Sequence, residues 1–138
     1  MKLIELATKS IAFNLYRGIT GELADIARTG QPIPQAERGS NFWIYGPVDE
    51  PFLKTLHNYD MDQQSNYAEP DGVIIKTTLI VPFQDGTYVF PPNWATCGDE
   101  YTWDDDSECE TTTTNLNGYI VSKGPTTSYE IVHDMLSQ

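Results

Sequence analysis

The sequence predicts a single small α+β domain over residues 1–138, in which antiparallel β-hairpins pack with short helices. Three observations lead to this fold class. Two β-prone runs each contain a turn sequence, helix-starting residues precede three short segments, and the length suits one hydrophobic core. The hairpins are expected at about 73–90 and 110–122, and the helices at about 20–29, 50–59 and 128–137.

The clearest β pattern begins at Val73. From there to Val81, every second residue is apolar or β-branched, which is typical of a strand. Asp85-Gly86 separates this run from the β-prone residues 87–90. An Asp-Gly step between two such runs favours a type I′ turn, because both central residues need a positive φ.

Three other segments give weaker signals for strands and loops. A strand is expected near 11–17, because apolar residues alternate there with small or polar ones. The second hairpin, 110–122, rests on the run Thr111–Thr114, a following Asn117-Gly118 and an apolar stretch. Residues 60–72 are polar and are expected to form a loop.

Two of the predicted helices have recognisable ends. The helix at 20–29 has Thr20 as a plausible N-cap and Gly30 as a stop. The helix at 50–59 has Asp49 as a cap and Pro51 in its first turn.

The third helix, 128–137, is predicted from a capping box formed by Thr127 and Glu130. Tyr129, Val132, Met135 and Leu136 would then share one apolar stripe. His133 would lie near the helix C-terminus, where the helix dipole favours a positive imidazolium.

Residues 30–51 form a long connection with four prolines and three glycines. In its middle lie Phe42, Trp43, Ile44 and Tyr45. These four residues suit either a short strand that closes a core or an anchor for a partner, and both interpretations stay open.

The charge is large and uneven. The chain carries 20 acidic and 8 basic side chains, for a formal net charge of −12. Residues 1–60 hold seven acids and six bases, whereas residues 77–122 hold eight acids and no base. Nucleic acids and anionic membranes are therefore not expected as partners, because affinity for them comes from clustered Lys and Arg.

Most of those acids surround one segment, residues 98–108 between Cys97 and Cys109, which we call the acidic segment. Seven of the eight lie within it or directly after it: Asp99, Glu100, Asp104, Asp105, Asp106, Glu108 and Glu110. The segment suits a solvated surface loop, a calcium site, a docking contact for a basic protein surface, or a carboxylate pair for catalysis. Its spacing does not match an EF-hand. In the docking interpretation, Tyr101 and Trp103 supply the anchors.

Two cysteines in 138 residues do not make a disulfide scaffold. Cys97 and Cys109 are expected as reduced thiols, with a single bridge as the alternative for a protein that ends up outside a cell. Together with His57 and His133 they lack the spacing of a zinc site. No metal or cofactor is predicted, and the calcium interpretation of the acidic segment stays open.

The absence of any catalytic motif in the sequence favours a non-enzymatic structural or assembly protein. Most concretely, we expect an accessory subunit of a virus particle, such as a tailed-phage tail, neck or capsid-decorating protein. Its partners would be other protein subunits in a homo- or hetero-oligomer. The candidate partner-binding residues are Trp43, Tyr45, Tyr101, Trp103, Asp104, Asp105 and Asp106.

Two other functions stay open. One is an acidic inhibitor that mimics nucleic acid and covers a basic protein surface. The other is a small-ligand binder or enzyme of unknown class, with Trp94 among the pocket aromatics and Asp104 or Glu108 as polar groups.

Because Glu5 and Lys9 interrupt the first apolar run, no signal peptide is expected. Synthesis in a cytoplasm, with incorporation into a virion, is the resulting expectation.

Overall fold

The structure is a computed structural model. It describes residues 9–36, 40–45, 60–97, 109–114 and 119–137. In this part of the chain the protein is mostly antiparallel β-sheet, so the predicted α+β class is right in kind but understates the strands.

The nine described strands are β1 (Lys9–Ile19), β2 (Asn41–Tyr45), β3 (Val73–Gln84), β4 (Thr87–Val89), β5 (Trp94–Cys97), β6 (Cys109–Glu110), β7 (Thr112–Thr113), β8 (Tyr119–Ser122) and β9 (Glu130–Asp134). The helical elements in the same residues are α1 (Gly21–Thr29), α3 (Asp60–Ala68) and a 3-10 turn, η2 (Met135–Ser137).

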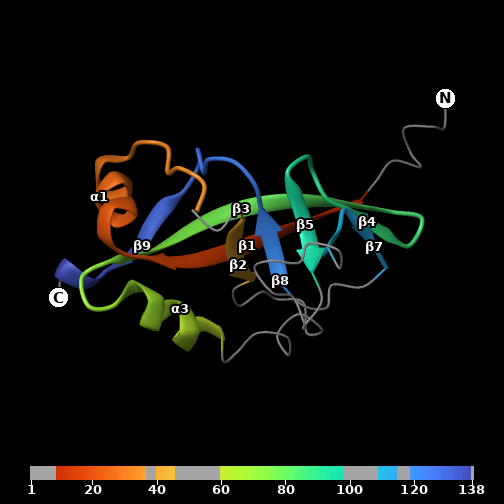
Figure 1. Cartoon of the computed structure of the whole chain (residues 1–138). Coiled ribbons are helices and arrows are strands. Elements are labelled where there is room, and N and C mark those ends of the chain that lie inside the picture. Colours follow the sequence, from red (N-terminus) through yellow and green to blue (C-terminus); the bar gives the residue numbers. More distant parts are fainter. Residues whose placement is uncertain (1–8, 37–39, 46–59, 98–108, 115–118, 138) are drawn as a thin grey trace.

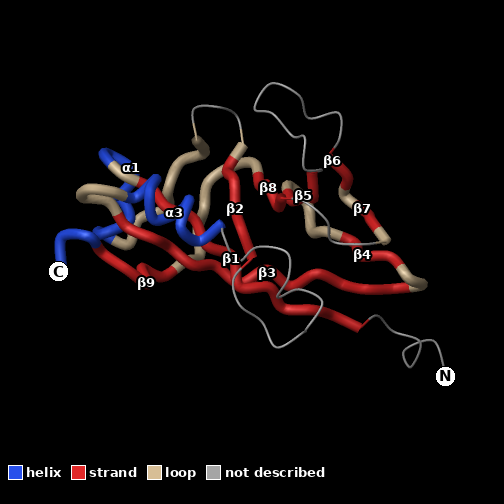
Figure 2. The backbone as a smooth tube through the Cα atoms, turned by 90° about the horizontal axis from the view of Figure 1, so that it is seen from below, coloured by secondary structure: helices blue, strands red, loops and turns tan. Residues whose placement is uncertain are grey.

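The strands form one sheet that curls into a nearly closed barrel. Its order is β6-β5-β8-β2-β1-β3-β4-β7, with β9 added beside β3. The two ends of this order, β6 and β7, are separated in the sequence by Thr111 alone, so the chain itself brings the ends of the sheet together. The long pair β1–β3 runs through the whole molecule, with α1 and α3 toward one end and β4, β5 and β7 toward the other (Figures 1 and 2).

The hairpin predicted at 73–90 is confirmed. Strands β3 and β4 pair antiparallel, with Phe83 opposite Tyr88. Asp85 and Gly86 between them have φ angles of 55° and 78°, as a type I′ turn requires. The strand expected near 11–17 is also confirmed. It extends to eleven residues as β1, because its whole length pairs with β3.

The hairpin predicted at 110–122 is wrong in its pairing. Residues in this range do form strands, but β7 pairs with β4, and β8 lies between β2 and β5. Ile120 and Val121 of β8 are buried. An interior strand needs a partner on each side, and here the partners come from distant parts of the sequence. Local turn signals do not report such pairings.

The helix predicted at 128–137 is also wrong. Residues 130–134 form β9, which pairs with β3, and only the short η2 follows. Ile131 lies opposite Ile75 and packs against the core. The edge of β3 offers unpaired backbone groups along its length, and pairing with them outweighs the helical spacing of the apolar side chains. His133 therefore lies in a strand and not at a helix C-terminus.

The helix predicted at 20–29 is confirmed as α1. Thr20 is its N-cap residue, but its hydroxyl donates to the Asp71 carboxylate at 3.1 Å instead of capping the helix. Gly30 adopts the left-handed conformation that ends the helix, as expected. The helix predicted at 50–59 lies outside the described residues.

The loop predicted at 60–72 is wrong in its first part, because residues 60–68 form α3. This helix has no broad apolar stripe. Its contact with the sheet depends on buried Gln64 and Ala68, four residues apart on one face, which lie against Gly18 of β1. Gly18 and Gly72 allow this close approach, because a Cβ at either position would collide with neighbouring backbone oxygen atoms.

The core lies inside the curled sheet and under α1. Residues 13, 15 and 19 of β1 contribute to it, together with apolar side chains of β3, β2 and β8. Trp43 of β2 is fully buried, and its indole N–H donates to Ser122 Oγ at 3.0 Å. The structure thus favours the core interpretation of the 42–45 segment. No helix among the described residues has the length and apolar character needed to cross a membrane.

Candidate functional site: a cavity around a buried arginine

The side chain of Arg17 occupies an inward position of β1. Side chains along this strand alternate, and Phe13, Leu15, Arg17 and Ile19 all lie on the buried side. Arg17 is only 6% exposed, whereas its three neighbours in this row are apolar core residues. A guanidinium in such a row is unusual, since charged groups are rarely buried without a partner.

The Arg17 guanidinium stays charged at neutral pH. Burial lowers its pKa to about 10, which is still well above 7. The ring of Trp43 lies 5.8 Å from its central carbon, within cation–π range. No described carboxylate forms an ion pair with it. A cation–π contact contributes about 0.5–2 kcal/mol. The desolvation of a buried charge costs several kcal/mol, so the charge is undercompensated by its described neighbours.

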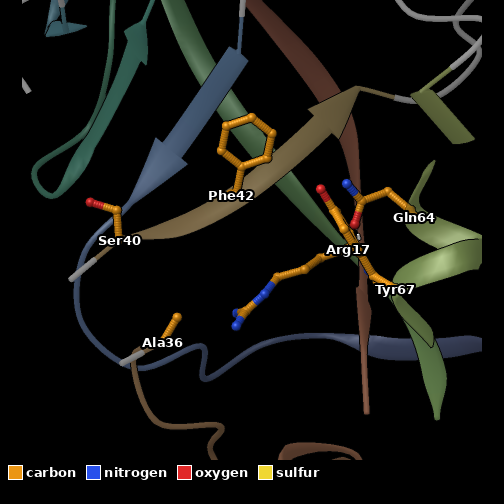
Figure 3. Close-up of a pocket in the computed structure, with 7 residues that line it drawn as sticks. Arg17, Ala36, Ser40, Phe42, Gln64 and Tyr67 are labelled. Atoms are coloured by element: carbon orange, nitrogen blue, oxygen red, sulfur yellow. Dashed lines mark hydrogen bonds between the residues drawn. The ribbon is translucent and has the colours of Figure 1, made fainter. Parts of the chain in front are cut away.

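Arg17 extends into a cavity of about 230 Å³ between β1, β2 and α3. Figure 3 shows its guanidinium directed toward Ala36 and Ser40, with Phe42 above and Tyr67 on the α3 side. The cavity wall is formed by Arg17, Gly18, Ala36, Ser40, Phe42, Gln64 and Tyr67. None of these residues supplies an imidazole, thiol or carboxylate. Among these described residues, Arg17 is the charged group, and Ser40, Gln64 and Tyr67 are the polar side chains that a bound molecule could contact.

Two polar groups in this wall are buried without a hydrogen-bond partner: Nη1 of Arg17 and Nε2 of Gln64. The amide oxygen of Gln64 does have a partner, because Oε1 accepts a hydrogen bond from the Gly18 N–H at 2.7 Å. That bond fixes which end of the amide faces away from β1. Both unpaired groups are donors, so each lacks an acceptor in the described structure.

A second feature is the bond between Cys97 and Cys109. The two residues lie opposite each other on β5 and β6 and form a disulfide. The expectation of reduced thiols is therefore wrong, and the alternative of a single bridge holds. The sequence does not reveal the strand register that brings the two Cβ atoms within bonding reach. The bond joins both ends of the acidic segment.

Few of the sequence-predicted site residues lie in the part of the chain that the structure describes. Trp43 is buried, and Trp94, half-buried on β5, packs against it with ring centroids 5.8 Å apart. Tyr45 lies in β2, but its side chain is not described. The remaining candidates lie outside the described residues: Tyr101, Trp103, Asp104, Asp105, Asp106 and Glu108.

The described residues contain no group of three or more His, Cys, Asp and Glu side chains placed to hold a metal ion. The sulfur atoms of Cys97 and Cys109 are bonded to each other and are not thiolate ligands. His57 lies outside the described residues, and His133 is exposed on β9.

Comparison of the chain with protein-family models, curated proteins and solved structures gives no significant match.

Sequence reasoning missed the Arg17 cavity, although one signal pointed to it. The alternation of Ile11, Phe13 and Leu15 continues through Arg17 to Ile19, which puts a cation in phase with the buried side of the strand. Gln64 gave no comparable signal, because its burial depends on the packing of α3 against β1.

Proposed function

We propose that this chain is a non-enzymatic structural or assembly protein that docks on other protein subunits through its acidic segment. The observation that carries the proposal is the disulfide between Cys97 and Cys109, which joins the two ends of the acidic segment at the edge of β5. Six acids and the anchors Tyr101 and Trp103 lie between the bonded residues.

A covalently closed segment suits docking. Ordering a chain segment on binding costs conformational entropy, and joining its ends beforehand reduces that cost. Clustered carboxylates attract a basic partner surface and speed the encounter. Aromatic side chains concentrate binding energy once contact is made.

The disulfide also favours the finer proposal of an accessory virion subunit, such as a tailed-phage tail, neck or capsid-decorating protein. Disulfides persist in oxidising surroundings, including virion surfaces and the outside of cells, and are rare in a reducing cytosol. A docking subunit of a particle that leaves its cell meets such conditions.

The test compares docking of the wild-type chain with that of two variants, Trp103→Ala and the triple change Asp104→Asn, Asp105→Asn and Asp106→Asn. The tagged chains are purified under native conditions from their source, and the mass of each complex is measured by mass photometry. We expect both variants to lose partner subunits while their circular dichroism spectra stay unchanged.

A charge-matched control carries Glu22→Gln, Glu69→Gln and Asp85→Asn, three exposed acids outside the acidic segment. This control should retain the complexes. A wild-type chain that is monomeric at all concentrations, with no partner subunit recovered, would overturn the proposed function. Equal loss in the control would assign the effect to net charge and not to the acidic segment.

A further inference from the structure

We propose that the cavity around Arg17 binds a carboxylate group carried on a small apolar body. The proposal rests on described residues of β1, β2 and α3 and does not depend on the acidic segment. If docking through the acidic segment is disproved, the carboxylate proposal still stands. If the carboxylate proposal is disproved, the docking proposal still stands.

The charge of Arg17 calls for an anion. Arg17 carries a buried positive charge that faces an aromatic ring and no described carboxylate. A buried charge needs a counter-charge or several hydrogen bonds, and the described neighbours of Arg17 supply neither. An anion in the cavity would supply both, since carboxylates pair with guanidinium groups through charge-assisted hydrogen bonds.

Two unpaired donors call for a hydrogen-bond acceptor. Nη1 of Arg17 and Nε2 of Gln64 are both buried, and both lack acceptors. An ionised carboxylate only accepts hydrogen bonds, so its chemistry complements either of these donors. The amide end of Gln64 is held in place by the bond from Gly18. The donor orientation therefore exists before a ligand arrives.

The rest of the wall favours a carboxylate on an apolar body over a phosphate. Phe42, Tyr67 and Ala36 present apolar surface beside the guanidinium (Figure 3). A phosphate would leave this surface without a contact, whereas an aromatic or branched acid would cover it. The volume of about 230 Å³ lies below the ~300–1,000 Å³ of sites for drug-sized molecules, so the acid is small.

The test is a titration of the full ¹⁵N-labelled chain with sodium benzoate, followed by NMR through the Gly18 amide and the Arg17 Nε–H. Acetate and inorganic phosphate are titrated in parallel. We expect saturable shifts with benzoate and weaker binding of acetate, which lacks an apolar body. Phosphate should bind more weakly than benzoate.

Two variants test the named donors. Arg17→Met keeps an unbranched apolar stem without the charge, and Gln64→Glu keeps an acceptor for Gly18 but replaces the unpaired donor with a carboxylate oxygen. Each should weaken benzoate binding at least about tenfold, as expected for the loss of a charge-assisted or buried hydrogen bond. If Arg17→Met fails to fold, Gln64→Glu decides.

Gln84→Glu is the matched control, because it makes the same charge change at an exposed position of β3. It should bind benzoate like the wild type. Four results would overturn the proposal: no saturable shift with benzoate, unchanged affinity in a folded Arg17→Met chain, phosphate binding as tight as benzoate, or equal weakening in Gln84→Glu and Gln64→Glu.

Discussion

Gly18 shows how a single residue decides whether a helix can pack on the sheet. The residue lies on β1, opposite Ile74 of β3, and the backbone oxygen of Gln64 occupies the space where a Cβ would be. A side chain at position 18 would push α3 away from β1. The same displacement would open the wall of the Arg17 cavity, since Gln64 belongs to both contacts.

We expect Gly18→Ala to lower the free energy of unfolding by about 1–3 kcal/mol, the usual cost of overpacking a tight contact. Urea unfolding of the variant and the wild type would measure it. Ser10→Ala, an exposed change on the same strand, is the control and should leave the midpoint unchanged. An unchanged urea midpoint in Gly18→Ala would mean that the close contact at Gly18 does not hold α3 against β1.

Asp134 gives a second prediction at the residue scale, because its carboxylate joins β9 to α1. Arg28 donates to it through Nε at 3.1 Å and Nη2 at 2.9 Å, and the Leu136 N–H donates at 3.0 Å. The hydrogen bond from Arg28, followed by that from Leu136, holds the pKa of Asp134 below its ordinary value of 3.8.

A carboxyl whose pKa is lower in the folded chain stabilises the fold above its ordinary pKa, and this stabilisation is lost as the pH falls. Asp134→Asn should therefore lower the melting temperature at pH 7, and the difference from the wild type should shrink below about pH 4. Thermal unfolding over this pH range measures both effects. Glu130→Gln, an exposed change on the same strand, should show a smaller difference at pH 7. A melting-temperature difference between Asp134→Asn and the wild type that grows as the pH falls would contradict a lowered pKa of Asp134.

At the scale of elements, the short strands β5 and β6 are joined both by backbone pairing and by a disulfide. They share two register pairs, one of which is the disulfide Cys97–Cys109. Strands this short form few backbone hydrogen bonds, so the bond between the sulfur atoms is a large share of what holds them together.

Replacing both cysteines by alanine should lower the free energy of unfolding by about 2–4 kcal/mol, because the cross-link limits the freedom of the unfolded chain. Adding a reductant to the wild type should give a loss of similar size. The same reductant should have no effect on the double variant, which serves as the control. Alkylation of both cysteines in the native, unreduced chain would contradict the disulfide.

Elements also show where sequence reasoning fails. The pattern at 73–90 predicted its hairpin because turn chemistry and strand alternation agree within one short stretch. The pattern at 128–137 predicted a helix because capping residues and apolar spacing agree there too, yet β3 offers a free edge to residues 130–134. Helix α3 was missed for the opposite reason. Its stability comes from one small contact surface around Gln64 and Ala68, and not from an amphipathic pattern.

At the scale of the whole molecule, the dominant feature is the formal net charge of −12. Self-repulsion of like charges disfavours the compact state, and salt screens it. Raising the ionic strength from about 0.01 M to about 0.1 M shortens the Debye length from about 30 Å to about 10 Å. At pH 7 the melting temperature should therefore rise with added NaCl.

The control is the same comparison near the sequence pI of about 4.2, where the net charge is small and the salt effect should largely vanish. Differential scanning calorimetry would measure both. A melting temperature that falls with salt at pH 7 would mean that local ion pairs, such as Arg28 with Asp134, outweigh the repulsion.

Local sequence patterns are enough to predict the strand–turn–strand unit at 73–90, the strand β1 and the helix α1, and the composition gives the net charge and its concentration between two cysteines. These features depend on neighbouring residues, whose side-chain alternation, turn chemistry and capping are visible in one dimension. The partners of β7, β8 and β9, the bond between Cys97 and Cys109, and the cavity at Arg17 become visible in the three-dimensional fold. Each of these depends on residues far apart in the chain, and the free energy that selects them comes from pairing and burial that no local pattern records.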